Sequence, residues 1–181
     1  HLIVADDSDF DCMNSDFTIS FFAFRDSTDP QNFHILWRND NNLTIGTSSN
    51  KINVNNQGIS TLINSKGLFN ENELIHFTFT KYQNTLKTYL NGTIDNQLIL
   101  QNPISLSSNG NLVFGKANSS PLYQFFGKLD DLGIWKRALT SQEIQQLYSN
   151  YTYNWSPGGE TTSSITVSPT STTTYTVDVN S

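Results

Sequence analysis

The sequence predicts an all-β sandwich, and three observations lead to that fold class. Asn, Ser and Thr number 22, 21 and 20 among 181 residues, whereas Glu and Ala number four each. Phe (12) and Tyr (7) are plentiful, and aromatic and β-branched residues favour strands over helices. Short alternating apolar segments recur roughly every eight to twelve residues with turn residues between them, a spacing typical of sandwiches and barrels.

The clearest strand covers residues 17–24, where Phe17, Ile19, Phe21 and Ala23 alternate with the residues between them. A period of two predicts one buried face and one partly covered face. The pair Asn91-Gly92 indicates a type I′ hairpin turn between two such strands. Further strands are expected at residues 33–38, 43–46, 51–54, 58–63, 74–82, 86–90, 94–100, 112–114 and 125–135.

One helix is expected, at residues 141–149. Thr140 is a suitable N-cap and Glu143 follows three residues later, which together make a capping box. Ile144, Leu147 and Tyr148 form a narrow apolar stripe. A helix this short is marginal alone, so we expect it to dock on the sandwich.

The composition changes after residue 150. In residues 151–181 a Ser/Thr-rich stretch follows Trp155, and Ile165 and Val167 alternate, as do Tyr175, Val177 and Val179. The pattern predicts a β-rich extension of two or three strands. About thirty residues are too few for an independent sandwich of ~100 residues, so the extension either packs on residues 1–150 or begins a second domain.

The charge balance argues against two classes of partner. There are ten Lys and Arg against sixteen Asp and Glu, with a net charge of −6, which does not suit nucleic-acid binding. No apolar run approaches the roughly twenty residues that a membrane-spanning helix requires.

The lone Cys12 cannot form an internal disulfide. A chain that starts at His1 is expected to be a mature or excised piece.

The segment 126–148 resembles the closing signature of laminin G-like, concanavalin A-like jelly-roll domains. That signature is a strand with Gly and paired acids, an aromatic residue, an Arg-Ala-Leu turn and a capped helix ending in Leu-Tyr, here Gly127, Asp130, Asp131, Trp135, Arg137, Ala138, Leu139, Thr140, Glu143, Leu147 and Tyr148. Residues 17–22, 86–92 and 112–115 resemble other strands of the family, although Phe22 stands where Trp is common. The resemblance covers about residues 2–150 and implies a jelly roll of two antiparallel sheets with one docked helix.

The extension resembles the latter part of the Ig-like or PKD-like repeats of large secreted surface proteins of Bacteroidota-type bacteria. The residues that carry this resemblance run from Trp155 through Pro157 and Gly158 to Tyr175 and Val177. The implied organisation is a laminin G-like domain at residues 1–150, followed by part of such a repeat at 151–181.

Calcium is the expected cofactor. It prefers about six to eight oxygen ligands, and Asp130-Asp131 supplies consecutive carboxylates, which point to opposite faces of a regular strand. The resemblance implies that Asp130 binds a structural calcium with carbonyl groups of the N-terminal segment, beside Asp131. Acids of the N-terminal run, namely Asp6, Asp7 or Asp9, could complete the site. Alternatively, Asp130 or Asp131 accepts loop hydrogen bonds or pairs with Arg137.

Glycan binding requires exposed aromatic rings together with groups that hold hydroxyls. We expect Tyr89 to be exposed, because it shares a strand face with Lys87 opposite Leu86, Thr88 and Leu90. Trp37 has equal claims as a core residue and as a platform. The remaining candidates are Tyr82, Tyr123, and Arg38 and Asp40 in the loop after Trp37.

A catalytic reading has less support. The Glu-x-Asp-x-x-Glu pattern that the resemblance would imply for a glycosidase does not occur; the four Glu are Glu71, Glu73, Glu143 and Glu160. A Gly-x-Ser-x-Gly elbow is also missing, and His34 and His76 lie in apolar strands, where a structural role is the simpler interpretation.

We therefore expect a non-catalytic binding or adhesion module of a large secreted or cell-surface bacterial protein, with a polysaccharide or glycan as its ligand. The alternatives are a spacer or protein-interaction module and a divergent glycoside hydrolase or lyase.

Overall fold

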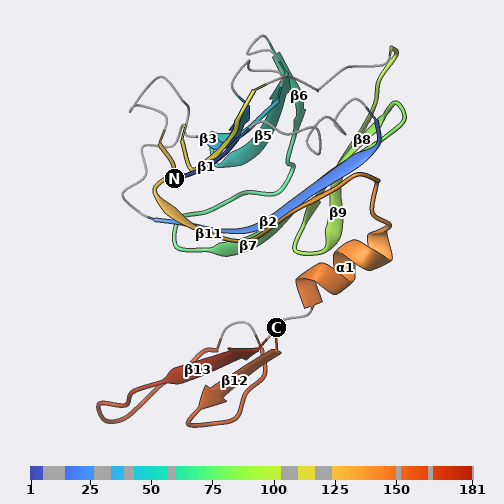
Figure 1. Cartoon of the computed structure of the whole chain (residues 1–181). Coiled ribbons are helices and arrows are strands. Elements are labelled where there is room, and N and C mark those ends of the chain that lie inside the picture. Colours follow the sequence, from blue (N-terminus) through green and yellow to red (C-terminus); the bar gives the residue numbers. More distant parts are fainter. Residues whose placement is uncertain are drawn as a thin grey trace.

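The computed structural model describes residues 1–5, 15–26, 34–38, 43–56, 60–102, 110–116, 124–149, 152–162 and 165–180. Two antiparallel sheets face each other as a sandwich, which confirms the predicted fold class (Figure 1). The upper sheet has the strand order β1-β10-β3-β4-β5-β6. Its strands are Leu2–Val4 (β1), His34–Arg38 (β3), Thr44–Ser48 (β4), Lys51–Asn56 (β5), Ser60–Asn64 (β6) and Leu112–Phe114 (β10).

The lower sheet has the order β11-β2-β7-β8-β9. Its strands are Phe17–Arg25 (β2), Leu74–Tyr82 (β7), Thr85–Leu90 (β8), Thr93–Ile99 (β9) and Gly127–Trp135 (β11). The sequence-based strand boundaries agree to within a few residues. The short strand β1, which the sequence showed only as an apolar tripeptide, pairs with β10.

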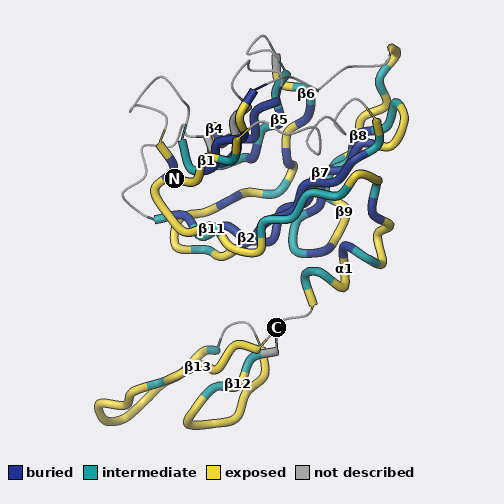
Figure 2. The backbone as a smooth tube through the Cα atoms, viewed as in Figure 1, coloured by how far each residue is buried: buried dark blue, intermediate teal, exposed yellow. Residues whose placement is uncertain are grey.

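The core lies between the sheets. Phe17, Ile19 and Phe21 on β2 point toward the upper sheet, and Phe17 and Phe21 pack on Phe79 and Phe77 of β7 with ring centroids 5.7 and 5.4 Å apart. Burial extends along most of β2 and along residues 75–81 of β7 (Figure 2). The alternating pattern of residues 17–24 thus marks the side that faces the core.

The opposite side of the lower sheet, here called the outer face, is also largely covered. The outer-face residues Thr18, Ser20 and Phe22 are 0, 1 and 5% exposed. The helix α1, Ser141–Ser149, lies against this face near β9 (Figure 1), and its buried Ile144 packs with Tyr89 of β8 and Leu139. The predicted docking of the helix is confirmed.

The turn between β8 and β9 is the predicted one. Asn91 and Gly92 both have positive φ, 49° and 73°, as a type I′ turn requires. The side chain of Asn91 also accepts a hydrogen bond from the backbone N–H of His76 at 2.9 Å. This turn is therefore fixed to the neighbouring strand.

The C-terminal extension forms one hairpin, β12 (Thr152–Ser156) with β13 (Thr176–Asn180), drawn below α1 in Figure 1. Trp155 pairs with Val177 and Tyr153 with Val179. The expected strand at Ile165 and Val167 is wrong: these residues belong to no strand. Ser/Thr-rich sequence surrounds them, and Pro169 lacks the N–H that a ladder needs. Within the described residues, no helix is long and apolar enough to cross a membrane.

Candidate functional site

A cavity of about 410 Å³ opens on the outer face, at the end of the lower sheet nearest the start of α1. Strands β7, β8 and β9 form its floor, and the loop before α1 forms one wall. Its described lining residues are Thr80, Tyr82, Thr85, Lys87, Tyr89, Gln97, Ala138, Leu139, Thr140 and Ser141. We call it the Tyr82 cavity.

Strand register arranges the floor in rows. Lys87 lies directly between Thr80 of β7 and Gln97 of β9. Tyr82 faces Thr85 in the next row. Residues directly opposite on antiparallel strands have Cβ atoms about 5 Å apart. The cavity therefore presents an ammonium, an amide, hydroxyls and an exposed phenol ring close together.

Thr18 fixes the wall of the cavity to the sheet. Its hydroxyl donates to the carbonyl of Arg137 and accepts from the N–H of Leu139, both at 2.9 Å. Thr18 is fully buried on β2. The hydrogen bonds of Thr18 with Arg137 and Leu139 thus hold the loop between β11 and α1. They define the position of Ala138 to Ser141.

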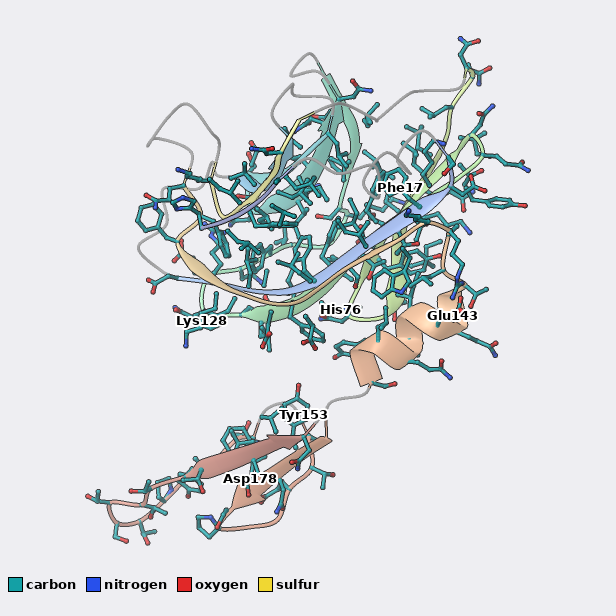
Figure 3. The ribbon with its side chains drawn as sticks, in the orientation of Figure 1. Phe17, His76, Lys128, Glu143, Tyr153 and Asp178 are labelled. Carbon is teal, nitrogen blue, oxygen red and sulfur yellow. The ribbon has the colours of Figure 1, made fainter. Side chains whose placement is uncertain are left out.

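The predicted capping box starts the helix at the rim of the cavity. The N–H of Glu143 donates to Thr140 Oγ1 at 3.2 Å, and the N–H of Thr140 donates to Glu143 Oε2 at 2.8 Å. Arg137 adds two hydrogen bonds to the same carboxylate at 2.6 and 2.9 Å. Hydrogen bonds from Arg137 and Thr140 lower the pKa of Glu143 to about 2. Figure 3 shows Glu143 on α1.

Tyr89 corrects one expectation. It occupies the predicted strand face with Lys87, but it is 2% exposed rather than open to solvent. Tyr89 packs with Ile144 and Leu139, and its hydroxyl lies 3.3 Å from that of Ser141. The face was assigned correctly from alternation, but exposure was not, because a helix more than fifty residues later covers this part of the sheet.

Tyr82 is the described candidate that is open to solvent, with 55% of its surface exposed. Trp37 and Arg38 belong to β3, but their side chains lie outside the described part of the structure, as do Asp40 and Tyr123. The structure therefore brings together Tyr82 and Tyr89 of the predicted set. Lys87, Gln97 and Thr80 also line the cavity. The pairing of β7, β8 and β9 places these three residues in one row, and that pairing could not be known from the sequence.

Asp130 and Asp131 do not follow regular strand geometry. A bulge shifts the register between Asp130 and Gly133, and Asp131 has a φ of 47°. Both residues are exposed, and the regular strand on which the expected opposite orientation depended is interrupted here. Asp130 Oδ1 accepts the N–H of Asp131 at 2.9 Å, and Arg137 binds Glu143 instead of either aspartate.

These two carboxylates do not by themselves make a metal site. Within the described residues, no three His, Cys, Asp or Glu side chains are grouped to hold a metal ion. Asp6, Asp7 and Asp9 lie outside those residues. The calcium site stays a prediction that depends on them.

His76 and Ser20 form a buried pair on the outer face of the lower sheet. Ser20 Oγ lies 2.7 Å from His76 Nε2 and 2.8 Å from Thr78 Oγ1. Ser20 and His76 are 1% and 2% exposed, so no substrate can reach them in this state. Burial lowers the pKa of His76 to about 4, and its ring contacts that of Phe22 in a tilted arrangement and stacks on that of Tyr148. The expected structural role is consistent with this geometry.

A second cavity, of about 420 Å³, lies on the outer face beyond the other end of α1. Its described lining combines aromatic rings with one acid and two amides, from Phe22, Phe24, Asn72, Glu73, Leu74, Asn91, Tyr148 and Tyr153. Neither Phe24 nor Tyr153 stood out in the sequence, because they come together only when the β12 strand follows the helix.

Comparison with known proteins agrees with this architecture. A laminin G-type family model, described as the concanavalin A-like lectin/glucanases superfamily, matches residues 1–145. A search among curated proteins finds no similar sequence. The matched residues end within α1, so the β12–β13 hairpin lies beyond the family match.

Three solved structures illustrate the structural likeness. One, titled for the dependence of botulinum neurotoxin type C cell entry on two ganglioside molecules, has a TM-score of 0.64 and 19% identity over 81% of this chain and 39% of that chain. The binding domain of botulinum neurotoxin DC, in complex with rat synaptotagmin II, has a TM-score of 0.67 and 17% identity over 84% and 41%. A proposed carbohydrate-binding protein from Bacteroides ovatus has a TM-score of 0.65 and 16% identity over 80% and 44%.

At these identities the likeness establishes the fold. The present chain spans less than half the length of each of those chains.

Proposed function

The chain belongs to the concanavalin A-like lectin/glucanases superfamily, and from that premise we propose that it is a non-catalytic glycan-binding module. It would belong to a larger secreted or cell-surface bacterial protein and serve attachment or adhesion. The observation that carries the proposal is the Tyr82 cavity, where an exposed phenol ring borders hydroxyl, amide and ammonium groups.

This chemistry suits a sugar. The apolar face of a pyranose ring can stack on the ring of Tyr82, while its hydroxyls exchange hydrogen bonds with Gln97, Thr85 and Ser141. The cavity volume of about 410 Å³ lies within the range usual for small-ligand sites. Because antiparallel strands form the floor, the groups that would contact the sugar are held on a rigid surface.

The similar structures support the same class of function. One title concerns interaction with gangliosides and another names a proposed carbohydrate-binding protein. Neither assigns a ligand or a site to this chain. A hydrolase or lyase is less well supported, because the described Ser–His pair is buried and Glu143 is engaged by Arg137.

A protein-interaction role is the second candidate. The edge strand β9 exposes Ile94, Leu98 and Ile99 by 48, 36 and 62%, and exposed apolar side chains at a sheet edge suit contact with another protein. One of the similar structures is likewise a complex with a protein partner. This role would leave the Tyr82 cavity without a ligand.

A glycan and polysaccharide array tests the proposal, with the wild-type chain and Tyr82→Ala compared in calcium and in EDTA. We expect saturable binding that falls about tenfold in Tyr82→Ala, since stacking on an aromatic ring contributes on the order of 1.4 kcal/mol, which is a tenfold change in Kd. Phe126→Ala is the matched control: Phe126 is an aromatic residue with 41% exposure beside the other end of β2.

The outcomes separate the candidates. Binding that Phe126→Ala leaves unchanged and Tyr82→Ala abolishes would support the site. Loss of binding in EDTA would support the calcium prediction at Asp130. A folded chain that binds no glycan under either condition would favour the protein-interaction role.

A further inference from the structure

We propose that the Tyr82 cavity selects acidic saccharides, with the carboxylate or sulfate of the sugar held at Lys87 Nζ. This inference rests on the proposed glycan-binding function and names the class of glycan. It is carried by the charge distribution in and around the cavity.

Lys87 is the one charged residue among the described residues that line the cavity. Its neighbours in the strand register are Thr80 and Gln97, whose side chains are neutral and can donate hydrogen bonds. The described lining includes no carboxylate. An anion in this row would therefore meet a positive charge and hydrogen-bond donors, with no opposing negative group in contact.

The ammonium group also lacks a protein counter-ion. Among the described residues, Lys87 takes part in no ion pair. The nearby wall carries one acid, Glu143, in the first turn of α1, and Arg137 binds that carboxylate through both guanidinium nitrogens. Lys87 thus carries a positive charge with no ion-pair partner among the described residues, in a chain whose net charge is −6.

Two further features favour the binding of an anion in the cavity. Lys87 is half-buried on β8, and a partly buried side chain has less conformational freedom to lose on binding. Helix α1 begins at Ser141 on the cavity rim, so the positive end of its dipole adds to the field. Charge-assisted hydrogen bonds to an anion are stronger than those to a neutral hydroxyl.

The test compares acidic ligands with neutral forms of the same glycan. Oligogalacturonate is titrated beside its methyl ester, and a sulfated oligosaccharide beside its unsulfated form, which separates the carboxylate from the sulfate source. At low ionic strength we expect at least one acidic form to bind about tenfold or more tightly than its neutral partner, and added salt to reduce that difference.

Three variants locate the effect. Lys87→Gln should remove the preference for the acidic form, whereas Lys87→Arg should keep it. Lys66→Gln is the control, because Lys66 is exposed and its structural hydrogen bond comes from the backbone N–H. Thermal unfolding of each variant establishes that it is folded before titration.

The outcomes of these titrations test the inference and the proposed function separately. Equal binding of acidic and neutral forms would overturn this inference and leave the glycan-binding function intact. An acidic preference that survives in Lys87→Gln, or falls equally in Lys66→Gln, would also overturn it. Failure of the folded wild-type chain to bind any of the four ligands or any glycan on the array would overturn both proposals.

Discussion

The hydroxyl of Tyr89 lies 3.3 Å from the hydroxyl of Ser141, so the lower sheet and the first residue of α1 touch at the base of the Tyr82 cavity. Tyr89 also packs with Ile144 and Leu139. One side chain therefore contributes both to helix docking and to the floor of the candidate site. The two contributions can be separated by mutation.

Tyr89→Phe should keep the packing and remove only the hydroxyl contact. We expect the free energy of unfolding to fall by about 0.5–1.5 kcal/mol, the usual net effect of one hydrogen bond. Tyr89→Ala would instead leave a cavity that costs about 3–5 kcal/mol, so loss of binding in that variant would say nothing about the site. Urea titration of both variants checks the prediction; equal destabilisation would show that the hydroxyl, not the ring, holds the helix.

Acid should weaken the fold through His76. Burial lowers the folded-state pKa of His76 to about 4 from the ordinary 6.5. Between these values the unfolded chain binds more protons than the folded one, so stability is complete above pH 6.5 and is lost as the pH falls toward 4. The loss is on the order of 3 kcal/mol.

His76→Gln is the comparison for this prediction. The variant should be less stable than wild type at pH 7, because the buried ring contacts with Phe22 and Tyr148 are lost, but it should show a shallower decline between pH 6.5 and 4. Chemical denaturation across that range measures both slopes. Parallel slopes in the two proteins would assign the acid sensitivity to other groups.

Much of the fold was predictable because local patterns carry it. Alternation at residues 17–24 gave β2, Asn91-Gly92 gave the β8–β9 turn, and the Thr140–Glu143 capping box gave the start of α1. Each signal lies within a few residues of what it specifies. The bulge at Asp131 has no such local signal, and a regular strand was the wrong expectation there.

The site was less predictable because it depends on tertiary contacts. Alternation placed Tyr89 and Lys87 on one face, but only the docked helix decides that Tyr89 is buried while Lys87 lines a cavity. The burial of Arg25 could not be predicted for the same reason. An arginine that ends a strand usually faces solvent, yet this one is fully buried.

Gly92→Ala should destabilise the chain for two reasons. Gly92 has a φ of 73°, which L residues adopt with strain. A Cβ there would also lie 3.1 Å from atoms of Tyr148 and Gln145 on α1. Gly115→Ala is the control, because its φ is 84° but its nearest contact would be an ordinary 3.5 Å.

We expect Gly115→Ala to cost about 1–2 kcal/mol and Gly92→Ala to cost clearly more. Thermal and urea unfolding give both values, and the signal of helix docking can be followed by fluorescence of Trp135, which packs beside Ile144. Equal effects would mean that α1 moves aside without loss.

Arg25 joins the two sheets, and removing it should destabilise the fold strongly. Its guanidinium donates to Asn50 Oδ1 at 2.7 Å, in the turn between β4 and β5 of the upper sheet, and to the carbonyl of Phe69 at 2.9 Å. Glu71 lies 3.4 Å away with 41% of its side chain exposed. Arg25→Met fills similar volume but leaves acceptors in the interior without their donor.

The expected loss for Arg25→Met is several kcal/mol, about 1–3 kcal/mol for each of the two acceptors left without a donor. Glu71→Gln should cost less than about 1 kcal/mol, since an exposed ion pair contributes little. Urea unfolding of the two variants makes the comparison. If Glu71→Gln proved as damaging as Arg25→Met, the ion pair would be what joins the sheets; if neither mattered, the hydrophobic core alone would hold them together.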